Sequence, residues 1–356
     1  MQVTIIHGSN DVYGASRVLL DEVAALRQIG HTVTVALPAR GPLTSALEEN
    51  GALVRIDPKI AVLRRSRMRD ALRLPVLPSY LRDADLVVLW TLALALYAPL
   101  LVVRRKQFYF SVHELLLGSF GSTLVRALVV PNSAPVFACS QAVAAWLAGL
   151  GVSRSRLHVT YPAFSWTVRE PSTPSERFTI AVVGRVNGHK GHREVTEAFL
   201  ARISDRPTWR LLLVGSPYPG QEAAYEEVEA LVDGHDQIEL LGEVPGFTSI
   251  SRQLNIVACF PDRPEPFGLV PVEAWAEGVR AAGFDDGGAA EVLRVVDGVR
   301  VPRGVNSVRA IGNALDEAWE HHRSWRAPSV EAVSSVFSSQ ARVRRLEAVL
   351  TAMDSK

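Results

Sequence analysis

The chain has 356 residues, 48% of them hydrophobic, which suits two domains with separate cores better than one. Its 38 basic and 37 acidic residues nearly balance, which argues against nucleic acid as the main partner. The only two cysteines, Cys139 and Cys259, lie in apolar runs, so a disulfide-stapled framework is excluded. With no signal-peptide pattern at residues 1–10, we expect a cytoplasmic protein.

The first half of the sequence alternates apolar strands with amphipathic helices. The predicted strands are 2–7, 31–38, 86–90, 107–114, 135–140 and 158–163. The predicted helices are 15–29, 43–51, 92–106 and 141–151. Nearly continuous apolar strands are typical of parallel sheets covered by helices on both faces. The pattern predicts an α/β, doubly wound, Rossmann-like domain over residues 1–163.

Residues 86–103 form an apolar run near the minimum length of a membrane-spanning helix. We interpret the run instead as a buried strand, 86–90, followed by a buried helix that ends in the cations at 104–106.

Residues 164–177 are rich in Pro, Ser and Thr without periodicity, and they predict a linker. Alternation then resumes, with strands at 178–184, 209–215, 238–242 and 255–260 and helices at 192–203, 222–233 and 272–278. We predict a second Rossmann-like domain over 178–329, and a C-terminal helix, about 330–356, that packs back on the first domain. Doubly wound domains bind ligands beyond the carboxyl ends of their strands, so the cleft between the domains is the expected site.

The stretch PEPFGLVPVEAWAEG, residues 264–278, follows a predicted strand. Pro271 suits the first position of a helix, which leaves the amides of Gly268, Leu269 and Val270 free to bind anions or hydroxyl oxygens. Glu265 and Glu273 would face the same ligand as acceptors for sugar hydroxyls. The alternative is two acids that only stabilise a helix N-terminus.

The stretch VVGRVNGHKGHREV, residues 182–195, joins a strand to a helix through a loop with three glycines. Arg185 and Lys190 flank these glycines, and the combination of backbone amides with two cations favours a diphosphate. The spacing matches neither a Walker A loop nor G-x-G-x-x-G. A solvated basic turn is the alternative.

Together, GRVNGHKG and EPFGLVPVE resemble the retaining glycosyltransferases of family 4, which have the GT-B fold of two Rossmann-like domains facing across a cleft. Supporting motifs are LLLVGSP, IELLGEVP and DGGAAEVL. The resemblance is firm over most of 178–300 and looser in the first half. Where the family has a strand like PVVAT after its second Glu, this chain has VRAAGFDDGG.

The resemblance assigns roles to individual residues. Arg185 and Lys190 would neutralise the donor diphosphate, and Glu265 would bind donor-sugar hydroxyls and support the charge at the anomeric carbon. A histidine of the first domain, here His113, would lie near the sugar; a structural hydrogen bond is the equal alternative. The remaining implied donor-binding residues are Gly14, Gly184, Glu243, Val244, Phe267, Gly268, Leu269, Val270 and Glu273.

The function implied is transfer of a sugar from a nucleoside-diphosphate sugar to a hydroxyl acceptor in cell-surface glycan or glycolipid synthesis, without metal or other cofactor. The D-x-D at 83–85 precedes a strand, so we interpret it as the end of a helix and the start of a strand. Alternatives are another GT-B enzyme, such as a nucleotide-sugar epimerase, and a non-catalytic partner subunit with this fold.

Residues 59–73 carry six cations and one acid. They form either a solvated face or, as the resemblance suggests for an enzyme with a lipid-linked acceptor, a peripheral contact with anionic lipid at the inner face of the membrane.

Overall fold

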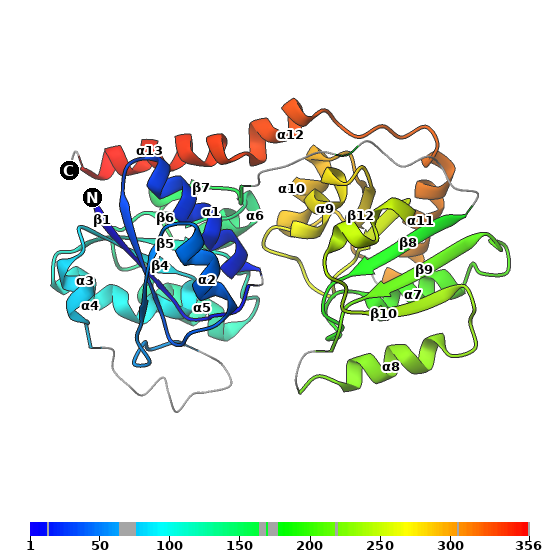
Figure 1. The fold of residues 1–356 in the computed structure, drawn as a ribbon, viewed down its shortest axis with the longest axis horizontal. Coiled ribbons are helices and arrows are strands. Elements are labelled where there is room, and N and C mark those ends of the chain that lie inside the picture. Colours follow the sequence, from blue (N-terminus) through cyan, green and yellow to red (C-terminus); the bar gives the residue numbers. More distant parts are fainter. Residues whose placement is uncertain are drawn as a thin grey trace. The chain divides into compact units, whose positions relative to one another are not determined.

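The structure, a computed structural model, describes residues 1–12, 14–63, 76–163, 169, 177–217, 220–304 and 306–354. Its contacts divide the chain into two units, one of Met1–Ser165 with Ser334–Lys356 and one of Trp166–Val333 (Figure 1). The predicted linker lies outside the described residues except for Arg169 and Arg177, and so does most of the basic stretch 59–73.

The first unit contains a parallel sheet whose described strands run in the order β3-β2-β1-β4-β5-β6-β7. These strands are β1 (Gln2–His7), β2 (Thr32–Leu37), β3 (Leu53–Ile56), β4 (Leu86–Trp90), β5 (Gln107–Val112), β6 (Val136–Ala138) and β7 (Leu157–Val159). All five residues of β4 are buried, as a central strand with both faces covered requires. The order reverses between β1 and β4, so the loops that follow these two strands leave the sheet side by side.

Helices connect these strands (Figure 1). They are α1 (Ala15–Gln28), α2 (Pro42–Glu49), α3 (Ser79–Asp83), the 3-10 helix η2 (Leu92–Tyr97), α4 (Ala98–Val103), α5 (Ser119–Leu128), α6 (Gln141–Gly149) and the 3-10 turn η3 (Arg154–Arg156). Gly30, with φ 90°, ends α1 because it accepts the left-handed conformation that closes the helix. The predicted helix 92–106 is thus a 3-10 helix followed by a short α-helix.

The first unit also contains the C-terminal helix α13 (Ser339–Asp354), which packs against α1. It follows α12 (Val330–Phe337), within which the boundary between the units falls. Arg342 of α13 is buried and donates to Glu22 of α1 and to the carbonyl oxygens of Thr160 and Tyr161. The end of the chain therefore completes the core of the unit in which the chain begins.

The second unit has its own parallel sheet, of order β10-β9-β8-β11-β12-β13 in the described residues. These strands are β8 (Phe178–Val183), β9 (Trp209–Val214), β10 (Ile238–Gly242), β11 (Ile256–Cys259), β12 (Arg280–Phe284) and β13 (Val299–Val301). The helices are α7 (His192–Leu200), α8 (Ala223–Val232), α9 (Leu269–Ala276), α10 (Gly287–Val295) and α11 (Ser307–His321), with 3-10 turns η4 (Phe247–Ser249) and η5 (Ser251–Gln253).

Both faces of this second sheet are buried. Along β8, Ile180 and Val182 join one hydrophobic core with residues of α7 and α11. Ala181, between them, joins a second core with residues of α9 and α10. This alternation across a covered sheet confirms the prediction of two Rossmann-like α/β domains.

Three features of the sequence can be checked against these elements. RAAGF, within the stretch that departs from the family's usual strand sequence, nevertheless forms β12. The D-x-D at 83–85 lies at the end of α3 and the start of β4, as predicted, and the Asp85 carboxylate accepts a hydrogen bond from the Gln2 amide. Within the described residues, none of the helices has the length and apolar character needed to cross a bilayer.

Candidate functional site

The order of strands in the second unit identifies where a ligand site forms. β8 lies between β9 and β11, so the loops after β8 and β11 diverge from adjacent strand ends. Such a switch point is where open α/β sheets bind ligands. The loop after β8 is 184–191 and the loop after β11 is 260–268, and these are the two stretches that the sequence singles out.

Glycine allows these two loops to touch. Gly191 has φ 81°, and a Cβ atom there would lie 2.1 Å from the carbonyl oxygen of Phe260, so a side chain at this position would separate the loops. Next to this contact, the amide of Asp262 donates to the carbonyl oxygen of His189 over 3.2 Å. The loops are therefore joined backbone to backbone.

An ion pair between Lys190 Nζ and Glu265 Oε1 joins the same two loops. The side chains are 40% and 20% exposed, so the pair is accessible to a ligand. The half-buried thiol of Cys259 at the end of β11 has a raised pKa, first because of burial and then because of Glu265, which outweighs the opposing effect of Lys190, with Glu273 adding a smaller increase. Lys190, Glu265 and Glu273 thus all lie within electrostatic range of one atom.

Helix α9 begins at Leu269, so the prediction that Pro271 opens this helix is wrong. Gly268 takes the N-cap position with φ 98°, a conformation that glycine adopts without strain, and the first turn begins directly after it. The amides of Leu269 and Val270 then belong to the first turn, where amides have no intrahelical partner. Phe267 is buried and anchors the loop, and Glu273 lies half-buried one turn into the helix.

The other predicted donor-binding residues of this unit lie around the same strand ends. Gly184, Arg185 and Gly188 belong to the loop after β8, and a Cβ on Gly184 would lie 3.3 Å from Cγ of Lys190. Glu243 and Val244 follow β10, two strands away from β8. Glu243 is exposed, whereas Val244 packs on the core of α9 and α10.

In the first unit, His113 directly follows β5, as predicted, and neighbouring residues fix its ring. Its Nε2 lies 2.9 Å from Oγ of Ser111, and the ring packs against that of Trp90 with 4.4 Å between centroids and a tilt of 32°. Trp90 also donates to the carbonyl oxygen of Ala15, next to Gly14, so it connects His113 to the start of α1. Gly14 is the N-cap residue of α1, with φ 51°.

The carboxylate of Glu114 organises the backbone next to His113. It accepts hydrogen bonds from the amides of Leu92 and His113, each over 3.0 Å. Between these strand ends, Thr91 has φ 81°, which is strained for a β-branched residue and is a feature that clusters at functional sites. Burial raises the pKa of Glu114 to about 7, against the hydrogen bonds that favour its charged form.

The charge state of His113 follows from its surroundings. Burial lowers the pKa of His113 well below its ordinary value, and the positive charge of Arg342 and the nearby His7 lower it further. The imidazole is therefore neutral at physiological pH and can share a hydrogen bond with a hydroxyl group.

Two polar clusters at the second unit's strand ends escape sequence reasoning. Nδ1 of His189 lies 2.9 Å from the carboxylate of Asp262 and 3.0 Å from the guanidinium of Arg263. Arg303 and Asp286 form a second pair near the same loop. The sequence does not reveal these pairs because the partners lie far apart in the chain. The one sequence feature that could have indicated them is that each of these residues follows a strand.

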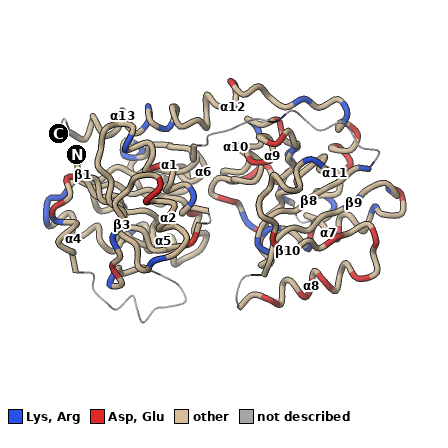
Figure 2. Tube along the Cα trace, in the orientation of Figure 1, with Lys and Arg blue, Asp and Glu red and all other residues tan. Residues whose placement is uncertain are grey.

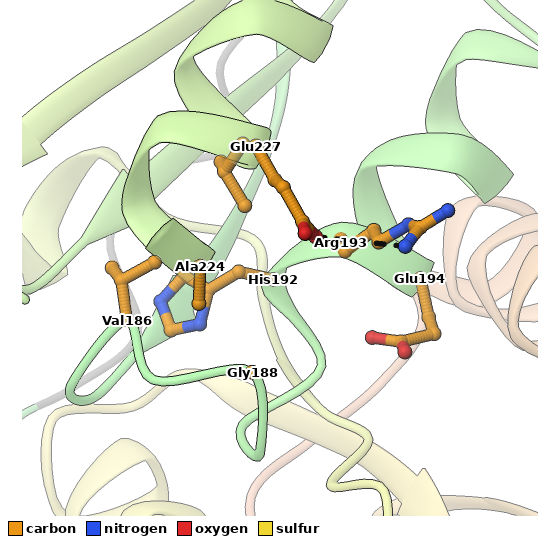
Figure 3. A pocket seen from close by; sticks show the side chains of 8 residues that line it. Val186, Gly188, His192, Arg193, Glu194, Ala224 and Glu227 are labelled. Atoms are coloured by element: carbon orange, nitrogen blue, oxygen red, sulfur yellow. Dashed lines mark ion pairs between the residues drawn. The ribbon is translucent and has the colours of Figure 1, made fainter. Parts of the chain in front are cut away.

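A hollow of about 120 Å³ lies beside the loop after β8, between α7 and α8 (Figure 3). Its lining includes His192, Arg193 and Glu227, and the last two form an ion pair at 3.6 Å. Helix α8 contributes carboxylates but no cations (Figure 2), and a nucleotide sugar needs a pocket of roughly 300 Å³ or more. The hollow therefore does not match a donor site, and the Lys190–Glu265 pair lies outside its lining.

No group of three or more His, Cys, Asp and Glu side chains suited to a metal ion occurs in the part of the chain that the structure describes.

Comparison with known families accounts for both units. The sequence profile of "Glycosyltransferase Family 4" matches residues 12–165, and that of "Glycosyl transferases group 1" matches residues 177–321. The chain belongs to the family 4 glycosyltransferases. Both loops of the switch point, and therefore Lys190 and Glu265, fall within the second match.

Solved structures agree with this family 4 fold over the full length. The Anabaena protein HepE has a TM-score of 0.79 at 21% identity, with 99% of this chain and 100% of that chain covered. Sucrose-phosphate synthase from Thermosynechococcus elongatus has a TM-score of 0.73 at 17% identity, with complete coverage of both chains. These likenesses establish the GT-B fold.

Curated relatives match this family 4 chain over segments. A lipopolysaccharide core biosynthesis mannosyltransferase of Rhizobium meliloti is 30% identical over 123 residues, which is 34% of this chain and 34% of that protein. An exopolysaccharide phosphotransferase of Streptomyces coelicolor is 28% identical over 185 residues, which is 50% of this chain and 19% of that protein. The matched segments thus cover about a third or less of these relatives.

Proposed function

We propose that the protein is a retaining glycosyltransferase that moves a sugar from a nucleoside-diphosphate sugar to a hydroxyl acceptor in the synthesis of a polysaccharide or lipopolysaccharide. The observation that carries the proposal is the Lys190–Glu265 ion pair at the switch point of the second sheet. A cation beside a carboxylate, next to the free amides of a helix start, matches the two halves of such a donor. The diphosphate takes the cation and amides, and the sugar hydroxyls take the carboxylate.

The roles of the donor-binding residues follow from this arrangement. Arg185 and Lys190 neutralise the diphosphate, and the Leu269 and Val270 amides donate to its oxygens or to the sugar. Glu265 accepts the sugar hydroxyls, and Glu273 accepts those of the ribose. The loop after β10, with Glu243 and Val244, approaches the base.

The relatives support this donor class. The mannosyltransferase of Rhizobium meliloti acts in lipopolysaccharide core biosynthesis, and HepE has been crystallised with UDP-glucose. Both are consistent with a nucleoside-diphosphate sugar as donor and a glycan as acceptor.

In the first unit, we propose that neutral His113 contacts a hydroxyl of the transferred sugar or of the acceptor. Ser111 and Trp90 hold its ring in one orientation, so the free part of the imidazole is preorganised. Such a contact strengthens if charge develops on the sugar in the transition state.

The proposed reaction passes through an oxocarbenium-like transition state. The bond from the anomeric carbon to the diphosphate oxygen breaks, and the acceptor oxygen bonds to the anomeric carbon on the same face. The acceptor proton passes to the departing diphosphate. Lys190 and Arg185 stabilise the charge that builds on the diphosphate, and Glu265 stabilises the positive charge on the sugar, so the chain supplies positioning and electrostatics without a metal.

A thermal-shift panel of UDP-, GDP-, ADP- and dTDP-sugars tests the donor. Binding to the folded state raises the melting temperature, by an amount that grows with ligand concentration over Kd. One nucleotide class should shift the wild type, and the shift should shrink in Glu265→Gln. A protein that responds to no nucleotide sugar contradicts the proposal.

Product analysis separates the alternatives. Incubation of the protein with the stabilising nucleotide sugar alone should give no epimer; an epimer would favour an epimerase. When a glycan from the cell that makes this protein is added as acceptor, the new linkage should keep the anomeric configuration of the donor sugar. NMR of the product measures this configuration. An inverted linkage would contradict the retaining mechanism.

A further inference from the structure

Arg303, two residues after β13, contacts three different parts of the second unit beside the loop that carries Glu265. Its Nε and Nη2 donate to the two carboxylate oxygens of Asp286 over 2.5 and 3.2 Å. Its Nη1 donates to the carbonyl oxygen of Pro261 over 2.7 Å. The guanidinium also lies over the ring of Phe284, 4.1 Å from its centroid. All these positions follow or end a strand at the carboxyl edge of the sheet.

Pro261 and Asp286 are the positions that place the 260–268 loop. Pro261 is at the start of this loop, and Asp286 is the N-cap residue of α10. The first turn of α10 supports the other part of the loop, because the amide of Gly288 donates to the carbonyl oxygen of Glu265 over 2.8 Å. A Cβ on Gly288 would lie 2.0 Å from the carbonyl oxygen of Pro266, so the loop rests directly on the helix start.

The planar guanidinium of Arg303, whose N–H groups form a fork of donors, couples these two supports. Its side chain is 24% exposed and that of Asp286 is 26% exposed, so the pair is better shielded than the neighbouring pairs of Asp285. Two parallel hydrogen bonds to a carboxylate fix the guanidinium plane, which leaves the third nitrogen aimed at the loop. Lysine cannot reproduce this, because an ammonium group is a single centre without the planar fork.

We infer that Arg303 is a positioning residue: it holds the 260–268 loop on α10 so that the Glu265 carboxylate meets Lys190. Arg303 acts through the backbone at Pro261 and through Asp286. The inference rests on the proposed function insofar as Glu265 binds the donor sugar. It predicts that loss of these guanidinium contacts disturbs recognition of the sugar more than recognition of the diphosphate, since Arg303 contacts Asp286, Pro261 and Phe284 and not the loop at 184–191.

The matched control is Arg300, on β13 itself, whose Nη1 lies 3.5 Å from Asp285 and whose side chain is 36% exposed. This ion pair does not involve the 260–268 loop. Arg300→Ala removes one guanidinium from the same strand region, so it measures what loss of charge alone does. Arg303→Ala and Arg303→Lys measure loss of the fork, the second with the charge retained.

Hydrogen exchange on the ligand-free protein gives the first readout. Amides of 261–268 and 287–290 should exchange about tenfold faster in Arg303→Ala and in Arg303→Lys, whereas amides of 184–191 and the remaining core keep wild-type rates. Arg300→Ala should leave both segments unchanged. The inference would be overturned if both Arg303 variants exchanged these amides at wild-type rates. It would also be overturned if Arg303→Lys exchanged amides faster by the same factor throughout the second unit.

Binding and turnover give the second readout, with the nucleotide sugar that stabilises the wild type and its free nucleoside diphosphate. Arg303→Ala should bind the free nucleoside diphosphate with an affinity within about twofold of the wild type. It should lose most of the additional affinity that the wild type has for the nucleotide sugar over the free nucleoside diphosphate. Its kcat should fall on the order of tenfold or more. Guanidinium chloride at tens of millimolar should restore part of kcat to Arg303→Ala but none to Lys190→Ala. If wild-type protein binds no nucleotide sugar, the proposed function fails while the exchange experiment still decides the role of Arg303.

Discussion

Arg342 donates from Nε and Nη2 to one oxygen of Glu22, over 2.8 and 2.6 Å, across a separation of 320 residues. Both side chains are 1% exposed, and the other Glu22 oxygen accepts the hydroxyl of Tyr109. This buried network joins the C-terminal helix α13 to helix α1 and strand β5. Strand β5 leads directly into His113, so helix α13 supports the region of the histidine that is expected to lie near the sugar.

Arg342→Met should lower the free energy of unfolding by about 3–5 kcal/mol, because it leaves the Glu22 carboxylate buried without its charge partner. Urea unfolding measured by circular dichroism tests this. Adding Glu22→Gln should recover part of the loss, since the unpaired charge is then removed. Equal stability of Arg342→Met and wild type would show that the pair contributes little.

Lys190→Ala should lower kcat/KM by an amount that corresponds to about 2–4 kcal/mol of lost transition-state stabilisation. This is the loss expected when one preorganised charge opposite a developing anion is removed. Steady-state kinetics with the donor found by thermal shift provide the measurement. Arg193→Ala is the control, because Arg193 lies three residues away in an exposed pair with Glu197. Similar losses in both variants would argue against a diphosphate cradle at Lys190.

Glu114→Gln should destabilise the protein by about 1–3 kcal/mol, because an amide side chain has one acceptor oxygen for two backbone amides and turns its NH₂ group toward the other. It should also lower kcat, since the amide of His113 loses its anchor. Urea unfolding and kinetics measure the two effects. Glu49→Gln, at an exposed end of α2, should change neither. An unaffected kcat would separate Glu114 from the site.

The half-buried carboxyl group of Asp21 should make the stability of the protein depend on pH. Burial raises the pKa of its carboxyl group from 3.8 to about 7, although Arg342 and Arg17 oppose the shift. A raised pKa means that the folded state binds the proton more tightly, so this contribution to stability is complete below about pH 4 and is lost as the pH rises toward 7.

Asp21→Asn should therefore be more stable than the wild type at pH 8, and this advantage should shrink or vanish by pH 4. Urea unfolding at the two pH values measures it. Asp236→Asn, at an exposed site, should follow the wild type at both pH values. An advantage of equal size at pH 4 and pH 8 would contradict the assignment.

Removal of divalent metal should leave transfer intact, because Arg185 and Lys190 supply the positive charge that a metal provides in other transferases. Initial rates with and without EDTA test this expectation. Loss of activity that magnesium or manganese restores would mean that the two cations are insufficient.

Much of the fold could be predicted from local sequence patterns. Runs such as LVVLW are typical of a doubly covered strand, and GRVNGHKG follows a strand and opens a helix, so its place at a strand end was predictable. Strand β12 was not among the predicted strands, because RAAGF is short and contains a glycine that weakens strand propensity. The start of α9 was placed too late, since Pro271 fits the first turn at more than one position and Gly268 decided between them.

The sequence by itself determined the doubly wound architecture and the two motifs of the donor site, because hydrophobic periodicity and glycine-rich turns act over neighbouring residues. Only the tertiary structure decided that Lys190 pairs with Glu265, that Trp90 packs against His113, that Arg303 donates to Pro261 and Asp286, and that Arg342 pairs with Glu22. Each of these contacts depends on strand order and helix docking. Those are fixed by the burial of whole faces, and they bring together side chains whose separation along the chain carries no local signal.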